Sequence, residues 1–317
     1  MSGHIFLIDP LEKLVPTKDS TLMLALSMMD RGIEVYLLFE KDFYFANTDK
    51  TPLKVFTFSG AFEESGAYLK NFSLEGEKWI EPGNQHTFHM RLDPPFDSRY
   101  LRYLWMFKSM KELRGIKVIN SPEGIMLHNE KLLAYEEKDS LKSFVGSGEV
   151  EFLKYLEQVE CQDLILKPMD LYQGIGVEKV SRHDETKLIE AFNRKVEEFK
   201  GPVIAQPFVK AVESGEIRAS FFAGVELGSI LKIPPKGDFL ANIAQGATFE
   251  ATTLNKVQLE RCKGICERLM RYDVPWVAFD ILGDQISEVN VTCPGLLVEV
   301  SKAKNKNLAL DIIKLLK

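Results

Sequence analysis

Short apolar runs alternate with a helical segment at the start of the chain. Residues 4–9 are nearly continuously apolar, which is typical of a buried parallel strand. Asp19 or Ser20 can then cap a helix over 21–31, and a second apolar run follows at 34–39. Because a helix joins the two runs, the order predicts a parallel α/β sheet with a crossover connection. No G-x-G-x-x-G lies between the first strand and its helix, so a dinucleotide-binding fingerprint is absent.

The next part of the chain is less regular. Residues 43–89 predict two or three strands. The double proline in the segment 91–97 (R-L-D-P-P-F-D) excludes a regular helix there and favours an extended loop. Asp97 or Ser98 then begins a predicted helix that runs to about residue 114.

The middle of the chain predicts a second group of elements. A strand over 117–120 leads to Ser121-Pro122, where proline at the first helical position opens a helix that we expect to carry residues 128–131. A strand over 163–168 ends in a lysine, and a glycine-containing loop precedes a return strand over 177–180. The remainder predicts a polar helix to about 200, a strand over 203–208, a hairpin over 216–231, a loop-like run to 250, a helix over 255–271 and a closing helix over 307–317. We expect three domains, over 1–121, 122–202 and 203–317.

Bulk properties narrow the function classes. The chain has 317 residues, of which 45% are hydrophobic and 27% charged, as in an ordinary globular protein. A net charge of -6 does not indicate the basic surface that binding to nucleic acid or an anionic membrane requires. The N-terminus lacks a signal-peptide pattern, and the four cysteines form no C-x-x-C pair. We therefore expect a cytoplasmic protein with no nucleic-acid or membrane partner.

The most informative segment is 276–290 (W-V-A-F-D-I-L-G-D-Q-I-S-E-V-N). It predicts two short strands joined by a tight turn at 283–284. Glu288 and Asn290 share one face of the second strand, and a hairpin can bring Asp280 across from that face. Two carboxylates and an amide oxygen suit Mg²⁺, which favours a few protein oxygens together with substrate phosphates. The alternative is a surface hairpin with solvated acids.

Cations lie at separate positions in the middle and C-terminal parts of the chain. Lys131, Lys167, Arg218 and Lys232, combined with a Mg²⁺ site, are the components of phosphoryl transfer. For any single lysine at the end of an apolar strand, the alternative is a side chain that extends into solvent at the sheet edge.

The order of these segments resembles the ATP-grasp superfamily, and within it the prokaryotic-type glutathione synthetases. The resemblance covers nearly the whole chain and rests on I-D-P-L-E-K at 8–13, K-D-S at 18–20, R-L-D-P-P-F-D at 91–97, N-E-K-L at 129–132, I-L-K-P at 165–168, A-Q-P-F-V at 205–209 and F-D-I-L-G-D…S-E-V-N-V-T-C-P at 279–294. It implies an α/β ATP-grasp fold with an N-terminal Rossmann-like parallel-sheet domain, a central lid domain and a C-terminal domain with the metal site. It also implies an ATP-dependent carboxylate–amine ligase that forms a peptide bond through an acylphosphate.

The resemblance also implies roles for individual residues. The implied nucleotide-binding residues are Lys131, Lys167, Gln206, Pro207, Phe208, Val209, Glu216 and Asn242. The implied catalytic residues are Arg218 and Lys232, and the implied ligands of Mg²⁺, or of Mn²⁺ in its place, are Asp280, Glu288 and Asn290. The implied substrate-binding residues are Asp19, Ser20, Arg91, Asp93, Thr292 and Cys293. Small peptide and amine substrates and a homo-oligomer follow from the same resemblance.

The chain departs from the family pattern mainly on the substrate side. Family cations are replaced by Leu92, Leu240 and Thr248, and a family arginine is replaced by Lys232. In the glycine-rich loop, Tyr172 and Gln173 replace glycines where close backbone approach is expected. Two functions therefore remain: a ligase with altered substrate specificity, or a nucleotide-binding protein of the same fold without ligase activity.

Overall fold

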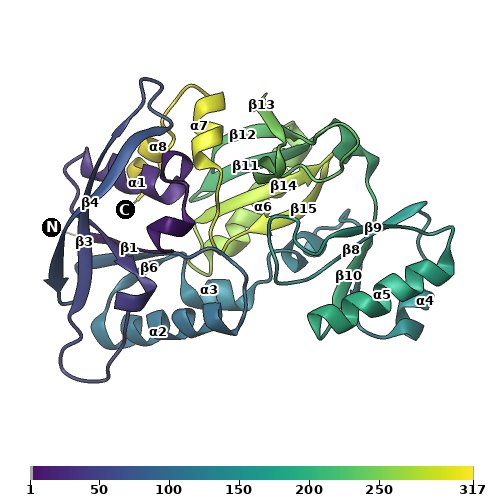
Figure 1. The fold of residues 1–317 in the computed structure, drawn as a ribbon, viewed down its shortest axis with the longest axis horizontal. Helices are drawn as coiled ribbons and strands as arrows, with labels where there is room; N and C mark the ends of the chain where they lie inside the picture. Colours follow the sequence, from purple (N-terminus) through teal and green to yellow (C-terminus); the bar gives the residue numbers. More distant parts are fainter. Residues whose placement is uncertain (1–2, 317) are drawn as a thin grey trace.

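The computed structural model describes residues 3–316, which form three β-sheets covered by helices (Figure 1). The N-terminal sheet has the order β4-β3-β2-β1-β5-β6. Its strands are β1 (Gly3–Ile8), β2 (Val35–Phe39), β3 (Leu53–Phe62), β4 (Leu69–Ile80), β5 (His86–Arg91) and β6 (Lys117–Ile119). The pairs β1–β2, β1–β5 and β5–β6 are parallel, whereas β3 and β4 form an antiparallel extension. The parallel core predicted from the first apolar runs is confirmed.

Helix starts in the N-terminal part follow the predicted caps. Helix α1 (Ser20–Met29) begins after Asp19, whose carboxylate accepts hydrogen bonds from the N–H groups of Thr21 and Leu22, each 2.8 Å long. Helix α2 (Ser98–Arg114) begins after Asp97, which accepts from the N–H of Tyr100. Each cap satisfies N–H groups that have no partner within the helix.

Helix α3 (Pro122–Leu127) is shorter than expected, so the prediction that it carries residues 128–131 is wrong. His128 has an extended backbone, and the side-chain oxygen of Asn129 accepts from the N–H groups of Lys131 and Leu132. This local side-chain bonding competes with the helix and starts a separate 3-10 helix, η4 (Leu132–Glu136).

The middle sheet is antiparallel and has the order β7-β10-β8-β9. Its strands are β7 (Phe144–Gly146), β8 (Asp163–Lys167), β9 (Glu178–Ser181) and β10 (Val203–Pro207). Helices α4 (Glu149–Leu156) and α5 (Glu185–Phe199) cover one face, where the rings of Phe152 and Phe192 stack at 4.2 Å. Because β10 pairs with β7 and β8, this sheet extends past the expected domain boundary at residue 202.

The C-terminal sheet is antiparallel and has the order β13-β12-β11-β14-β15. Its strands are β11 (Glu216–Phe222), β12 (Val225–Ile233), β13 (Thr248–Thr252), β14 (Trp276–Leu282) and β15 (Gln285–Asn290). Helix α6 (Lys256–Met270) follows β13. The run to residue 250 is therefore not all loop. Strand β13 is an edge strand with mostly exposed side chains, so its apolar pattern is too weak to mark it.

The C-terminal helices pack against the N-terminal part of the chain. Helices α7 (Leu297–Ala303) and α8 (Ala309–Leu315) pack against α1, and their buried side chains share one core with β1 and β2 (Figure 1). The sequence pattern indicated α8 but not the short α7. No helix within residues 3–316 is long and apolar enough to cross a membrane.

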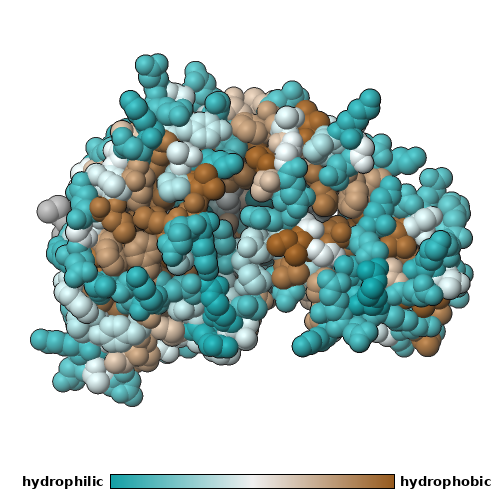
Figure 2. Space-filling view, in the orientation of Figure 1, coloured by the Kyte–Doolittle hydropathy of each residue, from teal (hydrophilic) through white to brown (hydrophobic). Residues whose placement is uncertain are grey.

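Figure 2 shows a notch between the part formed by β8–β10, α4 and α5 and the rest of the molecule. The ends of strands from all three sheets converge near this junction, which positions the site described next.

Candidate active site

One cavity of about 680 Å³ brings together residues from all three sheets. Every site residue predicted from the sequence lines it: Asp19, Ser20, Arg91, Asp93, Lys131, Lys167, Gln206, Pro207, Phe208, Val209, Glu216, Arg218, Lys232, Asn242, Asp280, Glu288, Asn290, Thr292 and Cys293. These residues are widely separated in sequence, so their convergence is a property of the tertiary fold. A concave site with several convergent polar groups is the usual form of a ligand-binding site.

The β14–β15 hairpin gathers the three predicted metal ligands. Asp280 is paired with Glu288 across the hairpin, and Asn290 is paired with Ala278. The Nδ2 group of Asn290 donates to Asp280 Oδ2 at 3.1 Å. Asp280 is only 4% exposed, and every residue of β14 is buried. The alternative of a surface hairpin with solvated acids is therefore wrong.

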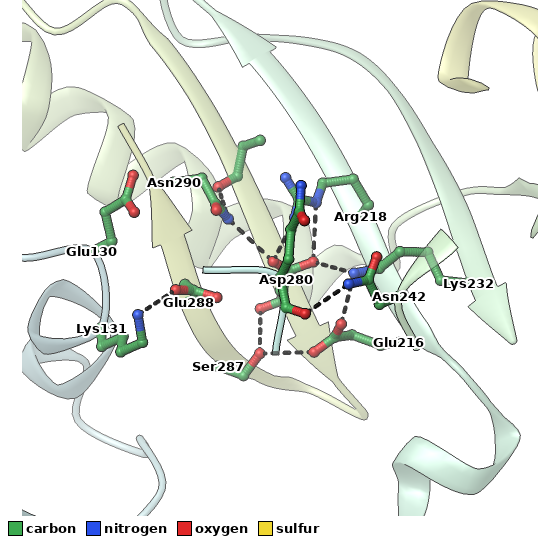
Figure 3. A network of polar contacts seen from close by, with 12 residues as sticks. Glu130, Lys131, Glu216, Arg218, Lys232, Asn242, Asp280, Ser287, Glu288 and Asn290 are labelled. Atoms are coloured by element: carbon green, nitrogen blue, oxygen red, sulfur yellow. Dashed lines mark hydrogen bonds and ion pairs between the residues drawn. The ribbon is translucent and has the colours of Figure 1, made fainter. Parts of the chain in front are cut away.

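Asp280 is held by two cations (Figure 3). Arg218 forms a bidentate pair with it, with Nε 3.0 Å from Oδ1 and Nη2 2.8 Å from Oδ2. Lys232 Nζ lies 2.7 Å from Asp280 Oδ1. Burial alone would raise the pKa of Asp280, but Arg218 and Lys232 outweigh it and lower the pKa from 3.8 to about 2. Asp280 is therefore ionised and charge-compensated.

Lys232 links Asp280 to a second, half-buried acid. Its Nζ also lies 2.7 Å from Glu216 Oε2, because β11 and β12 place Glu216 directly opposite Lys232. The hydroxyl of Ser287 donates towards Glu216 Oε1 at 3.3 Å and to the backbone oxygen of Asp280 at 3.1 Å. Burial opposes the charge on Lys232, but the two acids raise its pKa. Two carboxylates and two cations thus form one compensated network at the cavity wall.

Two further lysines line the cavity. Lys131 Nζ is 3.1 Å from Glu288 Oε1 and donates to the backbone oxygen of Leu171 at 2.8 Å. Lys167 ends β8 and is buried, and within residues 3–316 no carboxylate forms an ion pair with it. Burial lowers the pKa of Lys167 to about 8, against the opposing effect of Glu288. Lys167 is thus a buried cation whose donors face a cavity.

The segment after β10 forms an aromatic and backbone-lined end of the cavity. Gln206 accepts a hydrogen bond from the hydroxyl of Tyr135 at 3.2 Å. The ring of Phe208 lies under Lys179 Nζ at 3.7 Å and meets Phe239 edge-on. A flat apolar wall flanked by backbone groups suits a planar heterocycle.

The loop after β8 is fixed over the cavity even though it lacks the expected glycines. Gln173 takes a left-handed backbone conformation with φ 54°, as a glycine would. Its backbone oxygen accepts from Asn242 at 2.7 Å and from Gln245 at 3.3 Å. Lys131 and Asn129 bind the backbone oxygens of Leu171 and Met169 from the other side. The loop is therefore held beside the cavity with Tyr172 and Gln173 in place of the family's glycines.

The remaining end of the cavity is built by the N-terminal sheet and the start of α7. The guanidinium of Arg91 donates to Thr21 Oγ1 and to the backbone oxygen of Pro294, each at 2.9 Å, and lies over the ring of Trp276. The thiol of Cys293 lies 3.6 Å from the backbone oxygen of Arg91. The predicted substrate residues from both ends of the chain are thus in contact.

Two acids were missed by the sequence reasoning. Glu130 Oε1 accepts from the N–H groups of Val291 and Thr292 and from the Thr292 hydroxyl, at 2.7 to 2.8 Å, so it fixes the segment that follows β15. Its signal was its place in the N-E-K-L segment. Glu299, in α7, also lines the cavity, and no pattern marked it.

The departures from the family pattern fall in different places. Lys232 and Leu240 line the cavity. Leu92 is fully buried in the N-terminal core, and Thr248 is exposed at the start of β13; neither lines the cavity. The interpretation of Leu92 as a lost substrate cation is therefore wrong for this chain, because its side chain faces the core.

Comparisons with known proteins agree with this geometry. The profile of the prokaryotic glutathione synthetase ATP-grasp domain matches residues 130–305. The profile of the N-terminal domain of the same family matches residues 3–126. Glutathione synthetase of Prochlorococcus marinus subsp. pastoris is 28% identical over 98% of this chain and 97% of its own. Glutathione synthetase of Parasynechococcus marenigrum is 29% identical over 99% of this chain and 98% of its own.

Solved structures share the fold at lower identity. The D-cycloserine synthetase DcsG superposes with a TM-score of 0.68 at 15% identity, covering 99% of this chain and 100% of its own. A RimK domain protein ATP-grasp from Sphaerobacter thermophilus superposes with a TM-score of 0.57 at 14% identity, covering 98% and 99%. These likenesses show the ATP-grasp fold. Because the family profiles match both parts of the sequence, the chain belongs to the prokaryotic glutathione synthetase family and is an ATP-dependent carboxylate–amine ligase.

Proposed function

We propose that this ligase binds ATP between the middle and C-terminal sheets and joins a peptide carboxylate to an amine through an acylphosphate. The observation that carries the proposal is the single cavity in which Lys131, Lys167, Arg218 and Lys232 face the hairpin acids. Cations around a carboxylate cluster are the components that phosphoryl transfer needs, because the reaction depends on positioning and charge neutralisation.

The chemistry of the lining residues assigns the phosphates and the adenine of the nucleotide to different ends of this cavity. Lys131 and Lys167 contact the phosphates, since both are buried cations with donors at the cavity wall. The backbone of residues 206–209 reads the adenine, supported by the aromatic surroundings of Phe208. Glu216 accepts from the ribose hydroxyls, and Asn242 holds the loop carbonyl of Gln173 over the phosphates.

The hairpin residues fit a divalent metal ion, which enzymes of this family use together with ATP. Within residues 3–316 no group of three or more His, Cys, Asp or Glu could hold a metal ion, so the hairpin residues would hold the ion together with oxygens of the bound nucleotide. Asn290 donates its NH₂ group to Asp280, which turns its Oδ1 oxygen away from that pair. Glu288 adds carboxylate oxygens. Asp280 already accepts four hydrogen bonds, from Arg218, Lys232 and Asn290, so it would become a ligand only when one of these donors is displaced. This donor set suits Mg²⁺, or Mn²⁺ in its place, with Asp280, Glu288 and Asn290 as protein ligands. When bound, the ion neutralises phosphate charge.

Arg218 and Lys232 stabilise the charges of the reaction. A carboxylate is a poor electrophile, so transfer of the γ-phosphoryl group to it precedes attack by the amine. The tetrahedral oxyanion then needs a fixed cation, and Arg218 is fixed by its bidentate pair with Asp280. Asp19, Ser20, Arg91 and Asp93 bind the peptide, and Thr292 and Cys293 lie near the attacking amine.

We further propose that the substrate pair differs from γ-glutamylcysteine and glycine. Two cavity positions carry the proposal: Lys232 stands where the family has arginine, and Leu240 replaces another arginine. A charged hydrogen bond lost from a binding site is worth about 1.5 to 3 kcal/mol. Leu240 removes one such bond, which changes affinity by about one to two orders of magnitude, whereas Lys232 keeps the charge but not the bidentate geometry of arginine.

One experiment tests activity and specificity together. Purified protein is assayed for ATP-dependent phosphate release with a panel of γ-glutamyl and other dipeptides, each with several amines. Turnover with a pair other than γ-glutamylcysteine and glycine supports the proposal, and robust glutathione formation overturns the altered specificity. Calorimetry with Mg-ATP tests the nucleotide site by itself, and absence of binding up to millimolar ligand would remove it. The homo-oligomer implied by the family is tested by analytical ultracentrifugation.

A further inference from the structure

Glu299 is a buried carboxylate that lines the cavity and has no assigned role. It lies in the first turn of α7, its side chain is 4% exposed, and its Oε2 atom is buried without a hydrogen-bond partner in the part of the chain that the structure describes. A buried carboxylate oxygen without a donor is unfavourable for folding. Burial accordingly raises the pKa of Glu299. Its missing donor can come from a ligand in the cavity.

The cations of the protein do not satisfy Glu299. Lys18 and Arg218 both act on it electrostatically, but neither forms an ion pair with it among residues 3–316. Arg218 is already bound by both oxygens of Asp280, and Lys18 is exposed. Asp19 adds a second carboxylate on this side. The cavity wall at α7 therefore holds a carboxyl group that forms no ion pair within residues 3–316.

Arg91 presents the opposite charge at the same end of the cavity. Its guanidinium is buried, and its acceptors are neutral: Thr21 Oγ1 and the backbone oxygen of Pro294. No carboxylate between residues 3 and 316 forms an ion pair with it. A buried cation held only by neutral acceptors is suited to an anionic group of a ligand.

Consecutive residues at the start of α1 connect these two charges. The hydroxyl of Ser20 accepts from the N–H of Leu297 in α7 at 3.0 Å. The hydroxyl of Thr21 accepts from Arg91 Nε at 2.9 Å. Helix α7, which carries Glu299, and Arg91 therefore both contact the first turn of α1.

We propose that Glu299 is a specificity-determining residue that accepts a hydrogen bond from a protonated amine of the peptide substrate, while Arg91 holds a carboxylate of the same substrate. This inference rests on the proposed ligase function. It adds a role for Glu299 that neither the sequence pattern nor the charged network around Asp280 contains.

The test uses two peptides that differ only in that amine. The peptide of the panel that is turned over best is compared with its des-amino counterpart, which for γ-glutamylcysteine is glutarylcysteine, using phosphate release with the amines of the panel. We expect kcat/KM to favour the amine-bearing peptide by about tenfold or more, the worth of one charged hydrogen bond. Glu299→Gln is expected to remove this preference mainly through KM.

Matched variants separate an effect on substrate binding from an effect on folding and from a general effect of removing one negative charge. Glu12→Gln removes the same charge from an exposed residue that does not line the cavity, and should keep the full preference. Lys18→Met tests whether Lys18 is the true partner of Glu299. Thermal unfolding without substrate gives a second readout: Glu299→Gln should leave Tm unchanged or raise it, because a neutral amide costs less to bury than a carboxylate.

Each outcome decides between the alternatives. Loss of the amine preference in Glu299→Gln, with Tm maintained, supports the proposal. Retention of the full preference in Glu299→Gln overturns it, as does a preference lost equally in Lys18→Met with a lowered Tm in both variants. Equal turnover of both peptides by the wild-type protein overturns the role of Glu299 but leaves the ligase function intact. No turnover with any peptide and amine overturns the ligase function and this inference together.

Discussion

Arg218 and Asp280 are directly paired across β11 and β14, and both guanidinium hydrogen bonds end on the Asp280 carboxylate, at 3.0 and 2.8 Å. A residue expected as a metal ligand is thus also the anchor of the expected catalytic arginine. Lys232 adds a third contact from β12. The expected metal site and the expected catalytic arginine therefore depend on the same carboxylate.

Asp280→Asn should lose both activity and stability. It leaves Arg218 and Lys232 buried with too little negative charge, and removing one partner of a buried ion pair costs about 3 to 5 kcal/mol. Glu288→Gln is the matched control, because Glu288 is more exposed and has a single ion pair, with Lys131. It should lose phosphate release with a much smaller change in stability. Urea unfolding and the coupled assay measure both; turnover like that of the wild type in both variants would contradict the assignment.

Nucleotide affinity should fall as the pH rises through about 8, the pKa to which burial lowers Lys167. Below that pH the free protein carries the charge that phosphates need. Above it, binding must take up a proton, because phosphates favour the charged form, so affinity declines by up to about tenfold per pH unit. Lys167→Arg stays charged throughout and should flatten the profile. Calorimetry at a series of pH values checks this, and parallel profiles for the two proteins would refute it.

Gln173→Gly should not destabilise the protein. Gln173 has φ 54°, a conformation that costs a residue with a Cβ about 1 to 2 kcal/mol but costs glycine little. The hydrogen bonds from Asn242 and Gln245 end on its backbone oxygen and survive the change. Gln173→Val, which is β-branched, should lower Tm. If both variants unfolded at the same temperature, the strain at Gln173 would be excluded.

Restoring the family cation should have different effects at residues 92 and 240. Leu92→Lys buries a charge in the N-terminal core, where Leu92 is 0% exposed, and should lower stability by several kcal/mol. Leu240→Arg places a charge at the cavity wall, where it should leave Tm nearly unchanged and alter KM for the peptide substrate. Thermal unfolding with steady-state kinetics separates the two. A stable Leu92→Lys variant with altered substrate kinetics would reverse this interpretation.

Local signals predicted much of the fold. Asp19, Asp97 and Ser121 cap helices where expected, because a cap needs only a side chain and the next few N–H groups. The sequence overextended α3 and missed β7, α4, α7 and β13. Helix α7 is one of the shortest helices and is stabilised by packing against α1 and β12, and β13 by pairing at a sheet edge. Neither of these contacts is local in sequence.

The candidate site was predictable because its residues lie in short segments with a recognisable order. Each segment marked its own members, including Asp280, Glu288 and Asn290 on one hairpin. Glu299 was not predictable, because a single acid in a seven-residue helix has no distinctive spacing. Its significance depends on a missing hydrogen-bond donor, which only a complete set of neighbours can reveal.

The sequence by itself determined the hairpin, the helix caps and the family of the chain. Only the tertiary structure decided that Lys232 neutralises both Asp280 and Glu216, that Leu92 faces a core, and that Glu299 lines the cavity. The physical reason is strand register. Strand β11 pairs with β12 on one side and β14 on the other, so charges distant in sequence become neighbours only after the sheet has formed.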